Sequence, residues 1–261
     1  MKNIKEVELF LFDMDGTVYI GDREIEGSFD ALRELKKLGK KVCFFTNNSS
    51  RAASDYVARL HKMGYEATEN DIYTSSMVTC EYIRDHYRGK TVYLLGNLKL
   101  AAEFEKYGIK LVDENPDLLV LGFDTSLTYD RLYKFCIFLK EGKPYIVTHP
   151  DMVCPAEPAD MPDIGAMMLM IEATTGRRPD IVMGKPETPA GDGVKKRFGL
   201  PAEKIAMVGD RLYTDIAFGV NNGFVSVLVY SGETTPEMHE KSDIKADYAL
   251  GAVREIPSLL K

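Results

Sequence analysis

The fold of this chain is decided by the stretch Leu9-Phe10-Leu11-Phe12-Asp13-Met14-Asp15-Gly16-Thr17. Its first four residues form a continuous apolar run, which is typical of a strand buried on both faces in the middle of a parallel sheet. Two carboxylates follow the run at the carboxyl end of the strand, and a glycine then permits a sharp turn away from the sheet. We therefore predict that this end of the sheet carries the chemistry.

The pair Asp13 and Asp15 suits a reaction at phosphorus. One carboxylate can attack and form an acyl phosphate, which splits hydrolysis into two easier displacements, while its neighbour handles protons. The alternative is a simple turn at the end of a strand, because short Asp/Gly turns are common. The catalytic interpretation of this pair is favoured only if other polar groups converge on it.

Further strands and helices alternate with the first one. Helical spacing of apolar residues predicts helices over 29–38 and 56–63, and apolar runs predict strands at 42–45, 181–183, 205–208 and 225–229. Alternating strands and helices favour right-handed crossovers and a parallel sheet, whose ligand crevice opens at the carboxyl ends of its strands. The predicted fold class is therefore α/β, with a Rossmann-like parallel-sheet core.

Polar residues that suit a phosphate follow two of these runs. Thr46 and Asn47 end the strand at 42–45 and offer a hydroxyl, an amide and backbone N–H groups, although such residues are also common helix caps. Lys185 lies between Gly184 and Pro186 after the run at 181–183, and it can bring one positive charge to a phosphate. An isolated lysine, however, is usually a surface residue.

Acidic residues that suit a metal ion follow the run at 205–208. Asp210 comes directly after it and Asp215 lies five residues further on. Magnesium prefers a few carboxylates together with water and phosphate oxygens, and it would offset repulsion between Asp13 and a phosphate. Asp215 can instead be a favourable acid in the first turn of a helix. Four polar motifs at four strand ends make coincidence a poor explanation.

A second series of strands and helices interrupts the first. Apolar runs at 92–95, 118–121 and 145–147 alternate with helical patterns at 132–139 and 165–174. We interpret residues 79–180 as an inserted second domain, which leaves 1–78 and 181–261 as the catalytic core.

Taken in order, the four motifs resemble those of the haloacid dehalogenase superfamily. They stand as Asp13-Met14-Asp15-Gly16-Thr17, Thr46, Lys185, and Gly209-Asp210 with Asp215. The long insertion is similar to a C2-type cap, and the sequence resembles the NagD-like (class IIA) phosphatases over nearly its whole length. The segments that carry this closer resemblance are Phe44 to Ser49, Gly122-Phe123-Asp124, Leu127-Thr128-Tyr129, Thr148-His149-Pro150-Asp151 and Thr175 to Pro186.

The resemblance implies a role for each matching residue. Asp13 would be the nucleophile, and Asp15 would protonate the leaving oxygen and then activate water. Thr46 and Lys185 would hold the phosphoryl group. The other implied residues are Asp13, Asp15 (through its backbone carbonyl), Asp210 and Asp215 at a Mg²⁺ ion, and Asn47, Asn48, His149 and Asp151 at the substrate.

His149 departs from the pattern that this branch usually shows. The cap segment there resembles Thr-Asn-x-Asp, whereas His149 stands in place of the asparagine. An imidazole can contact a leaving group and changes its charge near neutral pH. The alternative is a solvated or hydrogen-bonded loop histidine, and both remain open.

Composition limits the partners. The net charge is -7 and no basic stripe is present, so we expect no nucleic acid polymer as a partner. The apolar runs are too short to span a bilayer, and membrane association is not expected. The four cysteines lack zinc-ligand or CxxC spacing and no secretory signal precedes them, which favours reduced thiols in the cytoplasm. A homodimer through the cap is expected from the resemblance.

These observations predict a Mg²⁺-dependent phosphatase that hydrolyses a small phosphorylated metabolite through a phospho-aspartate on Asp13. Sugar phosphates, nucleotides and similar phosphomonoesters are all open as substrates. A carbon-halogen hydrolase is disfavoured because Asp15 is present, and a phosphomutase because of the large cap. The alternative from another class is a non-catalytic protein that binds a phosphorylated metabolite for regulation.

Overall fold

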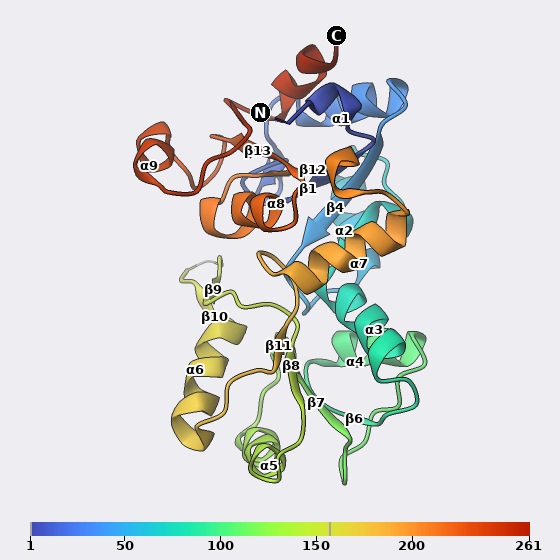
Figure 1. Ribbon diagram of the computed structural model, residues 1–261, viewed down its shortest axis with the longest axis vertical. Coiled ribbons are helices and arrows are strands. Elements are labelled where there is room, and N and C mark those ends of the chain that lie inside the picture. Colours follow the sequence, from blue (N-terminus) through green and yellow to red (C-terminus); the bar gives the residue numbers. More distant parts are fainter. Residues whose placement is uncertain (1, 157) are drawn as a thin grey trace. The chain divides into compact units, whose positions relative to one another are not determined.

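The computed structural model describes residues 2–156 and 158–261 (Figure 1). The chain divides into two compact units. The first, called here the core unit, contains residues 1–46, 53–73 and 185–261, and the second, called the insert unit, contains residues 47–52 and 74–184. Among the described residues, no helix combines the length and the apolar character needed to cross a membrane.

A six-stranded sheet organises the core unit. Strand β1 lies near its centre and pairs in parallel with β12 on one side and β4 on the other. The order of strands is β14-β13-β12-β1-β4-β5. Their bounds are β1 Leu9–Phe12, β4 Lys41–Thr46, β5 Ile72–Thr74, β12 Ile205–Gly209, β13 Val225–Val229 and β14 Tyr248–Leu250. A small antiparallel hairpin, β2 Tyr19–Ile20 with β3 Arg23–Glu24, follows β1.

The register of the central strands brings their carboxyl ends together. All four residues of β1 are fully buried, as its unbroken apolar run predicts. Phe12 is aligned with Val208 of β12 and with Phe44 of β4, and the Asp13 amide donates to the Val208 carbonyl at 2.9 Å. Residues that follow these three strands therefore leave the sheet at the same edge.

Helices complete the core unit. They are α1 Ser28–Lys37, α2 Ala53–Lys62, α7 Thr188–Phe198, α8 Ala217–Asn221 and α9 Pro236–Lys241, with short 3₁₀ segments at Ile4–Glu6, Glu69–Asp71, Ala202–Lys204 and Val253–Leu260 and a π-helical turn at Leu212–Ile216. Helix α1 buries Phe29, Leu32 and Leu35 against the sheet. Its apolar residues recur every three or four positions, which is why one face can be buried while the other stays charged.

The insert unit has its own parallel sheet. The strand order is β11-β8-β7-β6, with bounds β6 Val92–Leu95, β7 Leu118–Leu121, β8 Tyr145–Val147 and β11 Ile181–Val182. Figure 1 shows these strands between helices α5 Tyr129–Lys140 and α6 Ile164–Thr175 on one side and helices α3 Ser75–His86 and α4 Leu98–Lys106 on the other. A short antiparallel hairpin, β9 Val153–Cys154 with β10 Met161–Pro162, precedes α6.

One predicted strand belongs to a different sheet from the one expected. The apolar run at 181–183 does form a strand, β11, but β11 pairs in parallel with β8 of the insert unit. The expectation that Lys185 follows a strand of the core sheet is therefore wrong. The sheet to which a two-residue strand belongs is decided by the strand that pairs with it, and its own apolar pattern does not specify that partner.

Candidate active site

Lys185 joins two carboxylates of the core unit. Its ammonium lies 2.6 Å from Asp13 Oδ1 and 2.7 Å from Asp215 Oδ1, and it also donates to the Phe45 carbonyl at 3.2 Å. The lysine is almost completely buried. An ammonium has three donors, and three acceptors lie at hydrogen-bond distance from this one. This bridge fixes the carboxylate that follows β1 against the one that follows β12.

Asp210 is held by the two loops on either side of it. Its Oδ1 accepts from the Thr17 hydroxyl at 3.1 Å, and its Oδ2 accepts from the Glu233 amide at 2.7 Å. Gly16 has a φ of +82°, and a Cβ there would lie 2.4 Å from Asp210 Oδ2. The glycine after the paired acids is thus needed both for the turn and for the close approach of Asp210.

The three carboxylates of the core unit lie close enough to share a cation. Asp13, Asp210 and Asp215 each offer an oxygen, and these oxygens all lie within 4.8 Å of one another. Burial raises the pKa of Asp210 to about 6, with a further contribution from the charge of Asp13. Burial also raises the pKa of Asp215 to about 7, although Lys185 opposes this shift. A shared divalent cation would favour the ionised forms of all three groups.

Two cationic side chains and one further acid complete the charged part of the site. Burial alone would lower the pKa of Lys185, but the charges of Asp13 and Asp215 raise it above its usual value. The pKa of Arg211 is raised in the same way, chiefly by Asp13. Asp15 keeps some exposed surface, yet desolvation by the atoms packed around its carboxyl raises its pKa, against the opposing charge of Arg59.

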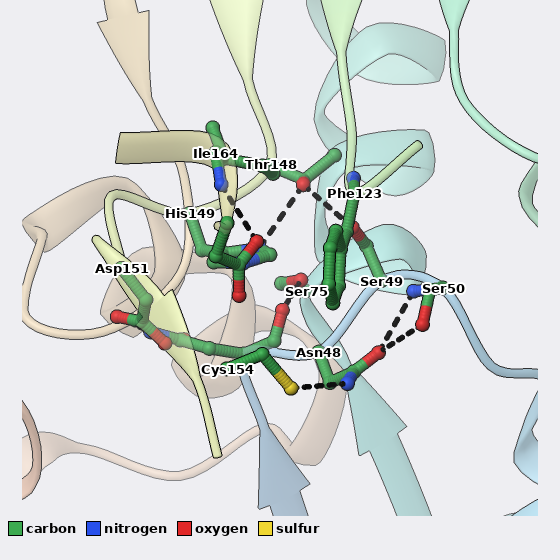
Figure 2. A network of polar contacts seen from close by, with 12 residues as sticks. Asn48, Ser49, Ser50, Ser75, Phe123, Thr148, His149, Asp151, Cys154 and Ile164 are labelled. Atoms are coloured by element: carbon green, nitrogen blue, oxygen red, sulfur yellow. Dashed lines mark hydrogen bonds and ion pairs between the residues drawn. The ribbon is translucent and has the colours of Figure 1, made fainter. Parts of the chain in front are cut away.

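The remaining predicted residues are divided between the units. Thr46 is the last residue of β4 and is buried in the core unit. Asn47 lies in the insert unit, where its side-chain amide donates to Asp151 Oδ1 at 3.0 Å. The Asn48 amide lies 3.7 Å from the sulfur of Cys154 (Figure 2).

His149 is completely buried in the insert unit. Its Nε2 lies 3.0 Å from Asp163 Oδ1 and its Nδ1 lies 3.2 Å from the Thr148 hydroxyl. Of the two alternatives, the structure describes the hydrogen-bonded histidine, and a contact with the leaving group stays a prediction.

Sequence reasoning missed two parts of these networks. The segment after β13 was not singled out, yet Ser231 donates to the Gly16 carbonyl at 2.8 Å and the Glu233 amide binds Asp210. Polar residues directly after a buried strand were the available signal. Asp163 was also missed, and here the only signal was its position as a capping acid before the helical pattern that became α6.

Family comparisons agree with this geometry. A family model described as haloacid dehalogenase-like hydrolase matches residues 10–110, and a HAD-hydrolase-like model matches residues 182–256. The chain is 32% identical over 253 residues to a 5'-nucleotidase, YutF, from Bacillus subtilis, which covers 97% of this chain and 98% of the relative. It is also 32% identical over 257 residues to an acid sugar phosphatase from Staphylococcus saprophyticus, covering 98% of both chains.

Solved structures give the same picture. A 4-nitrophenylphosphatase from Thermotoga maritima has a TM-score of 0.96 and 45% identity over the full length of both chains. A structure described as a putative nagD protein has a TM-score of 0.91 and 45% identity, over 97% of this chain and 98% of the other. A glycerol phosphate phosphatase from Mycobacterium tuberculosis, solved in complex with magnesium, has a TM-score of 0.89 and 27% identity over 98% of this chain and 78% of the other.

The fold, the acidic site and these similarities together define a hydrolase of phosphoric monoesters built on an α/β core with a cap. The chain belongs to the haloacid dehalogenase superfamily, in its class IIA, NagD-like branch. The predicted fold class is confirmed.

Proposed function

We propose that this protein is a Mg²⁺-dependent phosphatase that hydrolyses small phosphomonoesters through a phospho-aspartate on Asp13. The observation that carries the proposal is the bridge from Lys185 to Asp13 and Asp215, beside a third carboxylate from Asp210. A buried ammonium and three converging carboxylates are costly to maintain and are characteristic of reacting sites.

The first half of the reaction forms the acyl phosphate. An Asp13 oxygen attacks phosphorus, the bond from phosphorus to the leaving oxygen breaks, and Asp15 donates its proton to that oxygen. The raised pKa of Asp15 supports this role, because it keeps the carboxyl protonated to a higher pH. Lys185 and Thr46 hold the phosphoryl group, and the Lys185 ammonium also fixes the orientation of the nucleophile.

The second half returns the enzyme to its starting state. Asp15, now ionised, takes a proton from water, and the water oxygen attacks phosphorus of the acyl phosphate. The bond from phosphorus to Asp13 then breaks, which releases inorganic phosphate and restores the Asp13 carboxylate. The same side chain therefore serves as acid and then as base.

The residues of the core unit fit a magnesium ion. Asp13, the backbone carbonyl of Asp15 and Asp210 would hold it, with Asp215 acting behind them through its contacts with Lys185 and with the Arg211 amide at 3.2 Å. All of these donors are oxygens, as magnesium prefers. When bound, the ion supplies positive charge that offsets repulsion between the phosphate and the carboxylates.

The substrate class proposed is a small phosphorylated metabolite, such as a sugar phosphate or a nucleotide. The names of the relatives, a 5'-nucleotidase and an acid sugar phosphatase, support this range. We assign four residues of the insert unit to substrate binding: Asn47, Asn48, His149 and Asp151. Of these, Asn47, Asn48 and Asp151 would contact the substrate. The insert unit would thus act as the cap that chooses the substrate.

The test is phosphate release from p-nitrophenyl phosphate with Mg²⁺, then with EDTA, and then with Mg²⁺ restored. We expect turnover that EDTA abolishes and Mg²⁺ recovers, together with inhibition by beryllium fluoride, which mimics a phosphoryl group on an aspartate. Absent turnover would favour the non-catalytic alternative, and turnover that ignores EDTA would contradict the metal assignment.

We also propose that the protein forms a homodimer through the cap. One face of α5 carries three exposed apolar side chains, Tyr129, Tyr133 and Ile137, which are spaced four residues apart and are 81%, 61% and 41% exposed. Such a stripe is typical of a protein interface. Sedimentation measurements on the wild type and on Tyr133→Glu decide this point: a wild-type monomer would contradict it.

A reducing, cytoplasmic compartment is proposed as well. All four cysteines are free thiols, and three of them are buried. Free buried thiols are typical of proteins that are kept in a reducing environment.

A further inference from the structure

A chain of buried hydrogen bonds holds the segment 47–52 inside the insert unit (Figure 2). At its centre is the Ser49 hydroxyl, which accepts from the Phe123 amide at 2.9 Å and from the Thr148 hydroxyl at 2.9 Å. Both Ser49 and Thr148 are buried from solvent. Because water cannot replace these partners, each bond restricts the backbone on which Ser49 lies.

The chain continues from Thr148 to the imidazole of His149. Nδ1 of the ring lies 3.2 Å from the Thr148 hydroxyl, and Nε2 lies 3.0 Å from Asp163 Oδ1. The same carboxylate oxygen accepts from the Ile164 amide at 2.7 Å, at the start of helix α6. The helix thus anchors Asp163, and Asp163 in turn anchors the ring.

The order of donors follows from the chemistry of the groups. The single hydroxyl proton of Thr148 goes to Ser49, so the Thr148 oxygen must accept from Nδ1–H. The Asp163 carboxylate can only accept, so Nε2 must donate to it. With this order of donors the ring carries a proton on both nitrogens, which the third measurement below tests. A second carboxylate, that of Asp151, offers an oxygen within 4.8 Å and adds to the negative surroundings of the ring.

The neighbours of Ser49 are the two asparagines that we assign to the substrate. The Asn47 side chain is tied to Asp151, and its carbonyl oxygen accepts from the Ser75 hydroxyl. Asn48 uses its side-chain oxygen to accept from the Ser50 amide at 2.9 Å. Ser49, which directly follows these two asparagines, is the point at which the His149 chain reaches this segment.

We propose that His149 is a positioning residue: through Thr148 it fixes Ser49, and so it sets the placement of Asn47 and Asn48 for substrate binding. His149 itself is buried and acts on the segment through its hydrogen bonds to Thr148 and Asp163. The consequence for catalysis depends on the proposed phosphatase function, but the structural effect on the segment does not.

Two substitutions at His149 separate its two hydrogen bonds. In His149→Asn the amide nitrogen lies as many bonds from Cβ as Nδ1 does, so the donor to Thr148 is kept and the one to Asp163 is lost. In His149→Gln the amide nitrogen corresponds to Nε2, so the donor to Asp163 is kept and the one to Thr148 is lost. Thr148→Val removes the hydroxyl with little change of shape and should reproduce the glutamine variant.

The first measurement is amide hydrogen exchange at Phe123 and Ser50, which needs no turnover. We expect about tenfold faster exchange in His149→Gln and Thr148→Val, as the loss of one buried hydrogen bond gives, and little change in His149→Asn. Thr175→Val is the matched control, because it removes a buried hydroxyl at the other end of α6, where Thr175 donates to the Ile171 carbonyl. Equal exchange in all variants would overturn the proposal.

The second measurement is the division between KM and kcat for p-nitrophenyl phosphate. We expect the KM to rise about tenfold in His149→Gln and in Thr148→Val, with a smaller change in kcat, because a binding segment is loosened while the reacting groups are intact. If the wild type shows no turnover, the proposed function fails and hydrogen exchange still decides the positioning role. If His149→Gln does not fold, Thr148→Val carries the test.

The third measurement is the ¹⁵N chemical shifts of the His149 ring in the wild type. Both nitrogens should show the shifts of protonated imidazole. A neutral ring would overturn this order of donors, in which Nδ1–H donates to Thr148 and the Thr148 hydroxyl donates to Ser49.

Discussion

The two units place polar networks at corresponding points of parallel sheets, but the networks differ in charge. In the core unit, Lys185 faces Asp13 and Asp215, and a third carboxylate from Asp210 lies nearby. In the insert unit, the Ser49 hydroxyl accepts from the Phe123 amide and from the Thr148 hydroxyl, which continues the chain toward His149. Both networks are buried and follow strand ends, so topology alone does not distinguish them.

The difference teaches how a reacting site can be recognised. In the core unit the carboxylates outnumber the lysine that binds two of them, and burial, with a further contribution from the charge of Asp13, raises the pKa values of Asp210 and Asp215. In the insert unit two carboxylates, Asp151 and Asp163, lie beside one imidazole, so the excess of carboxylates is smaller, and contacts among hydroxyls and amides hold a segment in place. Unbalanced charge therefore indicates chemistry, and matched donors indicate positioning.

The largest effect is expected for Asp13→Asn, which removes the proposed nucleophile of the core unit. An amide is a far weaker nucleophile than a carboxylate, so we expect turnover to fall by about a thousandfold or more. The nearly equal size of the two side chains should leave the fold intact. Steady-state kinetics on p-nitrophenyl phosphate measures the loss, with circular dichroism as the check on folding.

The matched control for this substitution is Asp192→Asn, the same chemical change at an exposed residue of α7 that pairs with Lys195. Its activity should equal that of the wild type. Turnover in Asp13→Asn at the level of this control would contradict the assignment of the nucleophile.

The next effect in size is the stability lost in Lys185→Met. Removal of one member of a buried ion pair costs about 3 kcal/mol or more, because the partner charge stays buried. Because Lys185 lowers the pKa of Asp215, that carboxyl takes up a proton more readily in the variant and relieves part of this cost, so the loss should be larger at about pH 8 than at about pH 5. Urea denaturation at the two pH values measures it.

Lys195→Met is the control for that experiment, because the Lys195–Asp192 pair is exposed and of little energetic value. A loss in Lys185→Met no greater than in this control would show that the charged network of the core unit is not under electrostatic strain.

The smallest predicted effect is the pH dependence of stabilisation by Mg²⁺. The pKa of Asp210 is raised to about 6 and that of Asp215 to about 7, so the folded state binds protons more tightly than the unfolded chain. Without metal, these two groups therefore lower stability as pH rises from about 4 through about 7. Because a cation favours the ionised carboxylates, the rise in Tm on adding Mg²⁺ should be larger at about pH 8 than at about pH 5. A rise that shrinks with pH would count against the metal site.

Much of the core was predictable from local pattern. The unbroken apolar run of 9–12 specified a strand buried on both faces, and the acids after it mark the end of that strand, since neither property depends on distant residues. The gathering of Asp13, Lys185 and Asp215 was predicted from polar residues that follow successive apolar runs and from the resemblance of the motifs, and in the structure Lys185 lies within hydrogen-bond distance of both carboxylates.

The parts that could not be predicted depend on contacts between distant residues. Strand β11 joins the insert sheet because β8 is its pairing partner, which its two residues do not reveal. The surroundings of His149 are set by Asp163, fourteen residues away, across a hairpin whose course has no strong local signal. Burial of an imidazole with both nitrogens matched is a property of packing, and the motif around it says only that the residue is unusual.

The assignment of residues 47–52 to the insert unit has a consequence for building chimeric proteins. If only residues 74–184 were exchanged between relatives, Ser49 would come from one protein and its hydrogen-bond partners Phe123 and Thr148 from another. An exchange that includes residues 47–52 as well as 74–184 would keep the buried hydrogen-bond chain from Asp163 to Ser49 intact. The natural splice point after the second motif is therefore the peptide bond between Thr46 and Asn47.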